Sequence, residues 1–290
     1  MKIHFIGVGK MGLPMAAHLR TAAHEVTVRD PDAGRIALAR EQGLVVDEAG
    51  TAITAAEVVF SSLPHDDALL GVARLLAAHA QRGLVYVDTS TVSPRASGEA
   101  ATLLDAAGVH YLRCTVSGNN NMAQAARLTM MASGPRAAYD RVLPLLQAFG
   151  SSVFYLGEAE QARLMKLVVN LMIAQTSAML SEALTLGRKG GLDWNDMWQV
   201  LCASAVASPI LKAKSVQLSQ RDFTPTFTVE QMIKDLGLIL DVAAASNVPL
   251  PQTAMTQQLM RSAVAQGNGQ QDYAAIIKSV ERSAGLLPLE

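Results

Sequence analysis

A glycine-rich hexapeptide directly after the first apolar run most restricts how this chain can fold. Ile3–Ile6 has the composition of a buried strand, and residues 7–12, Gly-Val-Gly-Lys-Met-Gly, follow it and lead into a helical pattern. In that context the first glycine permits a tight turn, the second lets the backbone approach a pyrophosphate, and the third allows close helix–strand packing. We therefore predict a dinucleotide-binding loop formed by Gly7, Gly9, Lys10, Met11 and Gly12.

Short apolar runs of β-type residues alternate with helical stretches through the first half of the chain. This alternation predicts a parallel sheet with helices on both faces. The expected strands are Ile3–Ile6, Glu25–Arg29, Val58–Ser61, Val85–Asp88, His110–Arg113, Thr129–Ala132 and Ser152–Tyr155. The expected helices include Pro14–Ala22, Ala33–Glu41 and Ala96–Ala107. The sequence therefore indicates a Rossmann-type, doubly wound α/β domain over residues 1–158.

In the second half, apolar residues recur at helical spacing and the strand-like alternation disappears. A long helix is expected from Ala159 to Arg188, where Gly190-Gly191 ends it. Prolines such as Pro209 are expected to separate the later helices. Those helices are expected near Asn195–Ala203, Val229–Ser246, Pro251–Ala265 and Ala274–Ala284. We predict an all-helical domain over residues 159–290, built on the long interdomain helix.

Composition and charge argue against several classes of function. The formal net charge is −1 and no basic stripe with interleaved aromatic residues occurs, so nucleic-acid binding has no support. Cys114 and Cys202 lack the spacing of a metal site, and we expect no metal. We expect no signal peptide, and the apolar run from Leu164 to Leu186 carries too many polar residues for a lipid-facing span. We expect a cytoplasmic protein without a membrane partner.

Asp30 stands at the end of the second expected strand, 18 residues beyond Gly12. An acidic residue there typically hydrogen-bonds the adenosine ribose hydroxyls of NAD and repels the additional phosphate of NADP. Arg29 complicates this interpretation because a neighbouring arginine can accept that phosphate. Side chains alternate along a strand, so Arg29 and Asp30 should not both face the ribose. The alternative for Asp30 is a turn residue before Pro31. The pattern favours NAD over NADP.

Lys166 and Asn170 are four residues apart inside the long apolar helix, which places both side chains on one helix face. The pKa of a lysine in apolar surroundings tends to fall toward neutrality, because burial disfavours the charged form. Lys166 is therefore a candidate general acid/base, and the Asn170 amide is a candidate positioning group. The alternative is a core-helix lysine whose ammonium group reaches out to water.

Candidate ligand-binding segments lie where three expected strands end. Leu63-Pro64 follows the third, Asp88-Thr-Ser-Thr91 closes the fourth, and Ser117-Gly118-Asn119 follows the fifth. An open α/β sheet binds its ligand outside the carboxyl ends of its strands, so these residues are candidates for cofactor and substrate binding. The alternative for Ser90 and Thr91 is helix capping.

Five motifs, in order, resemble those of the β-hydroxyacid dehydrogenase family, which includes 3-hydroxyisobutyrate dehydrogenase and tartronate semialdehyde reductase. Gly7–Met15 resembles the family's GxGxMGxPM start, and Asp88–Pro94 resembles its DxSTxxP motif. Thr115–Gly118 resembles its PVSG segment, Lys166 with Asn170 its catalytic pair, and Lys234–Leu236 its late KDL motif. The resemblance covers nearly the whole chain.

The resemblance implies hydride transfer between a nicotinamide cofactor and a small 3-hydroxy acid or its semialdehyde. Lys166 would then be the general acid/base, and Asn170 would orient Lys166 or the substrate. The implied cofactor contacts are Leu63, Pro64, Ala68, Thr91 and Lys234, and the implied carboxylate contacts are Ser117, Gly118 and Asn170. NADP-using members usually carry Asn-Arg-Thr where this chain has Asp-Pro-Asp at 30–32, which again favours NAD.

The chain departs from the family pattern after Gly118. Asn119, Met122 and Ala126 replace family glycines, so the local backbone is expected to differ. Asn119 adds a donor and an acceptor at the substrate edge, which suggests a more polar or larger substrate than hydroxyisobutyrate.

Two rival functions remain. The first is imine reduction, but imine reductases of this fold usually carry a different residue, often Asp or Tyr, where Lys166 stands. The second is a non-catalytic scaffold, but scaffold relatives lack the lysine and carry a basic extension.

Met- and Leu-rich helices such as Met172–Leu186 leave apolar surface that indicates a homodimer or homotetramer.

Overall fold

The computed structural model describes residues 1–286, and its contacts divide the chain into two units, Met1–Lys166 and a second from Leu167 onward. The division falls inside one continuous helix, α7 (Gln161–Lys189). The predicted domain junction was between residues 158 and 159. The observed division lies slightly later in the chain, because the first turn of α7 packs with the first unit.

The first unit contains an eight-stranded sheet in the order β3-β2-β1-β4-β5-β6-β7-β8. Its strands are β1 (Lys2–Ile6), β2 (Glu25–Arg29), β3 (Val45–Val46), β4 (Val58–Ser61), β5 (Val85–Asp88), β6 (His110–Ser117), β7 (Thr129–Ser133) and β8 (Ser152–Tyr155). Chain order reverses at β1, since β2 and β4 pair with its two sides. This arrangement confirms the predicted Rossmann-type, doubly wound fold.

Three details of the sheet differ from the sequence prediction. The edge strand β3 was not predicted, because two residues are too few to show a pattern. β6 continues beyond Arg113, so Ser117 is the last residue of the strand rather than a residue after it. β7 pairs antiparallel with β6. The short link from Gly118 to Leu128 explains this, because a parallel return needs a longer crossover connection.

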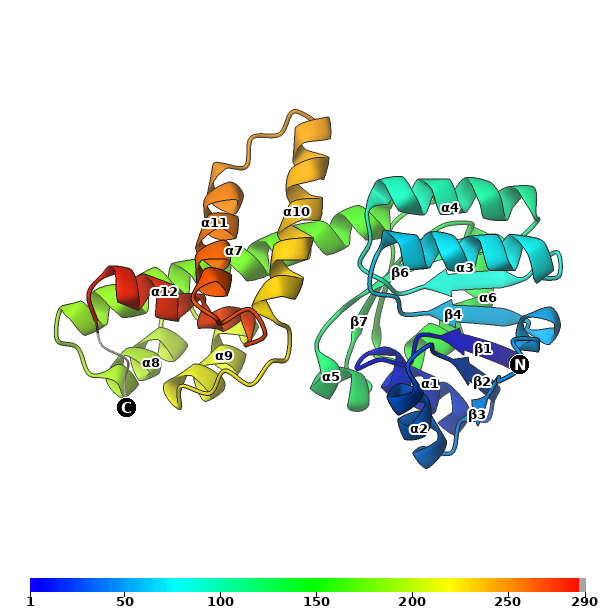
Figure 1. Cartoon of the computed structure of the whole chain (residues 1–290), viewed down its shortest axis with the longest axis horizontal. Coiled ribbons are helices and arrows are strands. Elements are labelled where there is room, and N and C mark those ends of the chain that lie inside the picture. The colour runs from blue at the N-terminus through cyan, green and yellow to red at the C-terminus, as the bar shows by residue number, and fades with distance from the viewer. Residues whose placement is uncertain (287–290) are drawn as a thin grey trace. The chain divides into compact units, whose positions relative to one another are not determined.

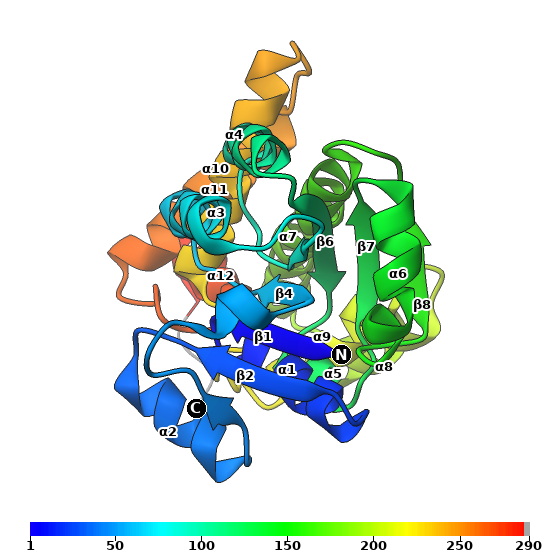
Figure 2. The ribbon, with the colours of Figure 1, turned by 90° about the vertical axis from the view of Figure 1, so that its right-hand side faces the viewer.

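Alternating side chains of the strands belong to two apolar clusters on opposite faces of the sheet. One face packs against α1 (Gly12–Thr21), α2 (Ala33–Glu41) and α6 (Arg136–Gln147), and the other against α3 (Asp66–His79) and α4 (Pro94–Ala106). In β5, Val85 and Val87 face the first cluster and Tyr86 faces the second. Figure 2 shows α3 and α4 on one side of the sheet and α6 on the other. The sheet therefore has helices on both faces, as predicted.

The described part of the second unit is helical, as predicted. Its helices after α7 are α8 (Trp194–Ala203), α9 (Pro209–Ser219), α10 (Val229–Ala245), α11 (Pro251–Ala265) and α12 (Ile276–Ser283), with the short 3₁₀ turn η2 (Tyr273–Ala275) before α12. α10 and α11 form a neighbouring pair beside α7 (Figure 1). Pro209 does not break a helix. It occupies the first turn of α9 after the capping residue Ser208, where the missing N–H costs nothing.

Helix α7 is apolar for most of its length and supplies residues to both apolar clusters of the second unit. Leu167, Ala174 and Ala178 belong to one cluster, and Leu180 and Leu184 to the other. By length and composition α7 could cross a membrane, and no other helix among residues 1–286 could. In the structure, 44% of its most apolar window is buried inside the protein.

His4 of β1 gives a prediction about stability and pH. Its side chain is fully buried, with Nδ1 2.9 Å from Thr27 Oγ1 and Nε2 3.9 Å from Asp47 Oδ2. Burial lowers the pKa of His4 to about 4, and the opposing effect of Asp47 is smaller. The unfolded chain takes up a proton near pH 6.5, so the folded state should lose stability as the pH falls from 6.5 toward 4. The loss should approach about 3 kcal/mol.

Urea unfolding of the wild type and His4→Leu across that pH range checks this prediction. The variant, which lacks the titrating group, should show a smaller loss of unfolding free energy on acidification. Equal losses in the two proteins would exclude His4 as the cause.

Candidate active site

The glycine loop between β1 and α1 requires glycine at two positions for reasons internal to the protein. Gly7 has a φ of +88°, and a Cβ there would overlap the Ser62 carbonyl. A Cβ at Gly12 would overlap the carbonyl oxygen of Gly7. At Gly9, by contrast, a Cβ would meet only the tip of the flexible Arg35 side chain, at 2.9 Å from Nη1. Only a movable side chain therefore borders the space beside Gly9.

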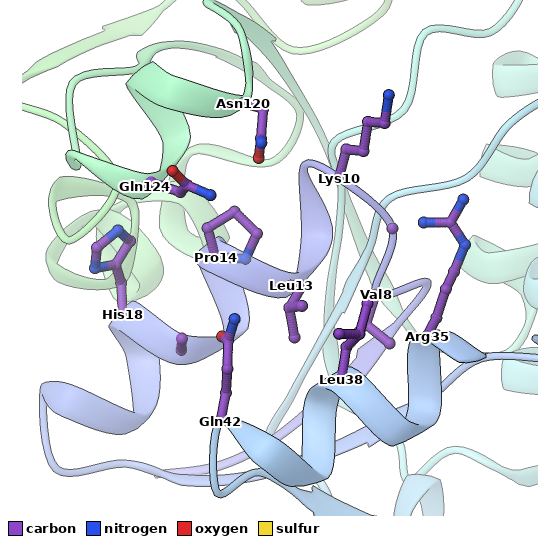
Figure 3. A pocket seen from close by; sticks show the side chains of 12 residues that line it. Val8, Lys10, Leu13, Pro14, His18, Arg35, Leu38, Gln42, Asn120 and Gln124 are labelled. Carbon is purple, nitrogen blue, oxygen red and sulfur yellow. The ribbon is translucent and has the colours of Figure 1, made fainter. Parts of the chain in front are cut away.

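The start of α1 fits an anionic ligand. No side chain of the described residues caps α1, whereas Asp32 caps α2 and Ser93 caps α4. The first amides of a helix need acceptors, and a phosphate group can supply them. A cavity of about 330 Å³ adjoins the loop, and Figure 3 shows Lys10 from the loop and Arg35 from α2 extending in the same direction beside it. Together, the uncapped helix, Gly9 and the two cations suit the pyrophosphate of a dinucleotide.

Asp30, at the end of β2, is part of the same loop. Its Oδ2 accepts a hydrogen bond from the Val8 amide at 2.8 Å, and its Oδ1 accepts one from the Asp32 amide at 2.9 Å. The carboxylate therefore holds the glycine loop and the start of α2 together. Its bond to the Asp32 amide corresponds to the turn role that the sequence offered as an alternative. Arg29 lies beside Gly50 instead, so the neighbouring side chains of Arg29 and Asp30 have different surroundings.

A buried polar cluster lies where β4, β5 and β6 meet. Asp88 Oδ1 accepts hydrogen bonds from Ser61 Oγ and Ser90 Oγ, both at 2.5 Å, and Asp88 Oδ2 accepts one from Arg163 Nη2. Arg163 is only 1% exposed, in the first turn of α7. Its Nη1 donates to the Ser90 carbonyl at 2.5 Å, and its Nη2 also donates to the Tyr111 hydroxyl at 2.8 Å. These contacts fasten the start of α7 to the carboxyl end of β5.

Arg163 and the two buried tyrosines of this cluster keep their charge states near neutral pH. Burial alone would lower the pKa of Arg163, but its interactions with Tyr111 and Asp88 raise the pKa overall. Burial also raises the pKa of Tyr86 and Tyr111, so both phenols remain neutral. The sequence analysis did not identify Arg163. The available signal was an arginine within an apolar helix, three residues before Lys166.

Leu63 and Pro64 lie in the loop between β4 and α3, Ala68 lies in the first turn of α3, and Thr91 follows β5. The Leu63 amide donates to Ser90 Oγ at 2.8 Å, which ties the loop after β4 to the buried cluster. The Ala68 amide donates to His65 Nδ1 at 3.2 Å, so His65 caps α3. Neither Ser90 nor Thr91 caps α4. Ser93 does so, and this corrects the capping alternative.

The segment after β6 reverses the chain sharply. Gly118 has a φ of +140°, and a Cβ there would lie 2.7 Å from Leu128 Cδ2. Asn119 caps the short helix α5 (Asn120–Gln124), because its Oδ1 accepts from the Met122 amide at 3.0 Å. Ala126 has a φ of 51°, the left-handed region that favours glycine. Ala126 therefore has the backbone conformation that glycine adopts most readily.

In α7, Lys166 is half-buried and Asn170 is buried at 4% exposure. Within the second unit, Asn170 Nδ2 donates to Asp235 Oδ2 of α10 at 2.5 Å. The Asp235 carboxylate is buried, and its Oδ1 lies 3.2 Å from Lys234 Nζ. Asp235 thus fixes the direction of the Asn170 amide. The sequence analysis noted Asp235 only as part of a motif and missed this function.

The candidate residues therefore fall into two groups, one in each unit. The first unit holds the glycine loop, Asp30, the segments after β4, β5 and β6, and Lys166. Asn170, Lys234 and Asp235 belong to the second unit. Lys166 and Asn170 lie on consecutive turns of α7.

Comparison with known proteins agrees with this description. Residues 2–157 match the family model described as the NAD binding domain of 6-phosphogluconate dehydrogenase. Residues 161–280 match the model described as NAD-binding of NADP-dependent 3-hydroxyisobutyrate dehydrogenase.

Individual relatives match over nearly their whole lengths. The chain is 33% identical to 2-(hydroxymethyl)glutarate dehydrogenase of Eubacterium barkeri, covering 99% of this chain and 97% of the relative. It is 31% identical to 2-hydroxy-3-oxopropionate reductase of Escherichia coli K12, covering 98% of each. The structure of 3-hydroxyisobutyrate dehydrogenase from Mycobacterium tuberculosis with L-serine superposes with a TM-score of 0.88 at 27% identity, covering 96% of this chain and 98% of that one. The chain therefore belongs to the β-hydroxyacid dehydrogenase family of NAD(P)-dependent oxidoreductases, and its cofactor is a nicotinamide dinucleotide.

Proposed function

We propose that this enzyme interconverts a small 3-hydroxy acid and its semialdehyde, with NAD(H) as cofactor and Lys166 as general acid/base. The observation that carries the proposal is the placement of Lys166. It is half-buried in a helix whose first turn is fastened by Arg163 to the carboxyl end of β5, the sheet edge where such folds bind ligands. When bound, the dinucleotide supplies or accepts the hydride.

Within this proposal Lys166 gives a proton to the carbonyl oxygen during reduction and takes one from the hydroxyl during oxidation. Asn170 orients Lys166. Its amide nitrogen is directed at Asp235, which leaves its oxygen as the acceptor suited to an ammonium group. The remaining N–H of the Asn170 amide can assist in holding the substrate carboxylate. Lys234 is proposed to contact the nicotinamide end of the cofactor.

The substrate carboxylate is proposed to lie against Ser117 and Gly118 at the end of β6. Asn119 uses its Oδ1 to cap α5, so its amide nitrogen is the group available to a polar substrate substituent. The Eubacterium barkeri relative acts, by its name, on a 3-hydroxy acid with a second carboxylate. A substrate of this more polar kind suits Asn119 better than hydroxyisobutyrate does.

Oxidation of NADH and NADPH followed at 340 nm tests the proposal. The aldehyde panel contains methylmalonate, tartronate, succinate and sulfonated semialdehydes, 2-formylglutarate and glyoxylate, and a cyclic imine represents the rival chemistry. Turnover of one acid semialdehyde supports the proposal. Turnover of the imine alone would favour an imine reductase, and tight NADH binding without any turnover would favour a non-catalytic binding module.

NAD is proposed as the preferred form because Asp30 places a carboxylate at the end of β2 and residues 30–32 lack the phosphate-binding arginine. Arg35 stands beside Gly9, near the proposed pyrophosphate position. Asp30→Asn keeps the shape of the side chain, removes its charge and can accept only one of its two backbone hydrogen bonds. We expect this variant to lower the NAD-over-NADP ratio of kcat/KM by about tenfold, or about 1.4 kcal/mol.

Asp32→Asn is the matched control for Asp30→Asn. It removes the same charge two residues away, from the cap of α2. The control should leave the cofactor ratio within about twofold of the wild type. Equal changes in the two variants would attribute the preference to general charge rather than to Asp30.

A homodimer or homotetramer is also proposed. Met172, Met179 and Leu186 on α7 are 65%, 56% and 76% exposed, and their spacing of seven keeps them on one helix face. Such a stripe can pair with the same stripe of a second copy, and sedimentation velocity of the wild type and Met179→Lys tests this pairing.

A cytoplasmic location is also proposed, and cell fractionation tests it.

A further inference from the structure

Arg163 uses most of its hydrogen-bonding capacity inside the first unit. Besides the Asp88 carboxylate, the Ser90 carbonyl and the Tyr111 hydroxyl, its Nε donates to Ser97 Oγ at 3.3 Å. These partners come from the end of β5, from β6 and from α4. The guanidinium group therefore fixes the first turn of α7 against two neighbouring strands and a helix that covers the sheet.

Two residues with proposed roles are connected through this cluster. Lys166 follows Arg163 by three residues on the same helix. Because helix geometry is regular, fixing the backbone at Arg163 also fixes the position and orientation of the backbone at Lys166. Ser90 accepts from the Leu63 amide at 2.8 Å and donates to Asp88 at 2.5 Å. The same carboxylate thus fixes the loop proposed to line the dinucleotide and the helix that carries the proposed acid/base.

A buried ion pair is a poor way to gain stability, because removing two charges from water costs about as much as their attraction returns. A well-packed apolar pair would serve the fold equally well. What an apolar pair cannot supply is the direction imposed by a planar guanidinium group that binds several acceptors at fixed angles.

We propose that Arg163 and Asp88 are positioning residues that hold Lys166 in register with the cofactor-binding loop. This inference rests on the proposed role of Lys166. It assigns the pair to orientation, in addition to any contribution to stability.

Three variants test the proposal. Arg163→Met leaves the Asp88 charge buried and should lower both thermal stability and kcat. Arg163→Met/Asp88→Asn removes both charges and should recover most of the stability. Its kcat should stay about 100-fold below the wild type, with the dinucleotide Kd and the substrate KM within about threefold. Arg163→Lys, which keeps the charge but not the planar fork, should recover part of kcat. In the double variant the primary deuterium isotope effect on kcat should rise as the chemical step becomes slower.

Arg188→Met/Glu281→Gln is the matched control. Arg188 lies at the other end of the same helix and donates to Glu281 of α12 at 2.6 Å, and Glu281 also accepts from Arg221. It should lower the melting temperature and leave kcat and the isotope effect unchanged.

The possible failures can be distinguished. If the double variant at Arg163 and Asp88 recovers stability and wild-type kcat together, the pair is structural and the inference is wrong. If both double variants lower kcat in proportion to stability, orientation is likewise excluded. If Lys166→Ala itself retains turnover, the proposed function fails first, whatever Arg163 does.

Discussion

Replacing Lys166 by alanine should lower kcat by about 10³-fold, since a positioned general acid/base typically contributes 10²- to 10⁴-fold. The glycine loop, Asp30 and the Leu63 loop lie on other elements, so the Kd for NADH should stay within about twofold of the wild type. Steady-state kinetics on the substrate found in the panel, together with titration of NADH fluorescence, measures both quantities.

Lys189→Ala is the control for this result. Lys189 is the last residue of α7, is exposed, and donates to the Ala284 carbonyl at 2.9 Å. Its loss should leave kcat unchanged. Retained turnover in Lys166→Ala, or loss of NADH binding with unchanged turnover, would remove Lys166 from the chemical step.

Alanine at Gly12 and alanine at Gly9 should produce different defects. The new methyl group at Gly12 overlaps the Gly7 carbonyl, so the loop must rearrange and the variant should unfold at lower temperature and lose dinucleotide binding. At Gly9 only the Arg35 tip must move, so the variant should fold normally. Its Kd for NADH should nevertheless rise by about 100-fold or more, because the methyl group occupies the approach of the pyrophosphate.

Calorimetry and NADH titration of the two variants check this pair of results, with Gly98→Ala in α4 as the control. No atom lies within 4 Å of a Cβ built at Gly98. That variant should be more stable by about 0.5–1 kcal/mol and bind NADH normally. Normal binding by Gly9→Ala would place the pyrophosphate elsewhere.

The local patterns of the sequence were sufficient for the architecture. Alternation of strands and helices, the glycine loop and the long apolar helix each act over fewer than about 30 residues, within the range where such patterns are informative. β7 was the exception, because its direction depends on where β6 ends and how short the following link is. α9 was missed for a different reason, since a proline begins a helix as readily as it ends one.

The site was less predictable where partners are distant in sequence. Arg163 and Asp88 are 75 residues apart, and Asn170 and Asp235 are 65 apart. Nothing in a local window pairs them, although a charged residue within an apolar segment was a usable signal in each case. The backbone at Ala126 could not be predicted either, because its left-handed φ is imposed by the surrounding turn and not by alanine itself.

The most direct test of the proposed chemistry uses NADH labelled with deuterium at C4 of the dihydronicotinamide, with the fastest acid semialdehyde of the panel. The hydroxy acid produced should carry one deuterium on its carbinol carbon for one of the two labelled faces, and Lys166→Ala should form it about 10³-fold more slowly. A product without deuterium from either face, or equal rates for the wild type and Lys166→Ala, would contradict Lys166-assisted hydride transfer.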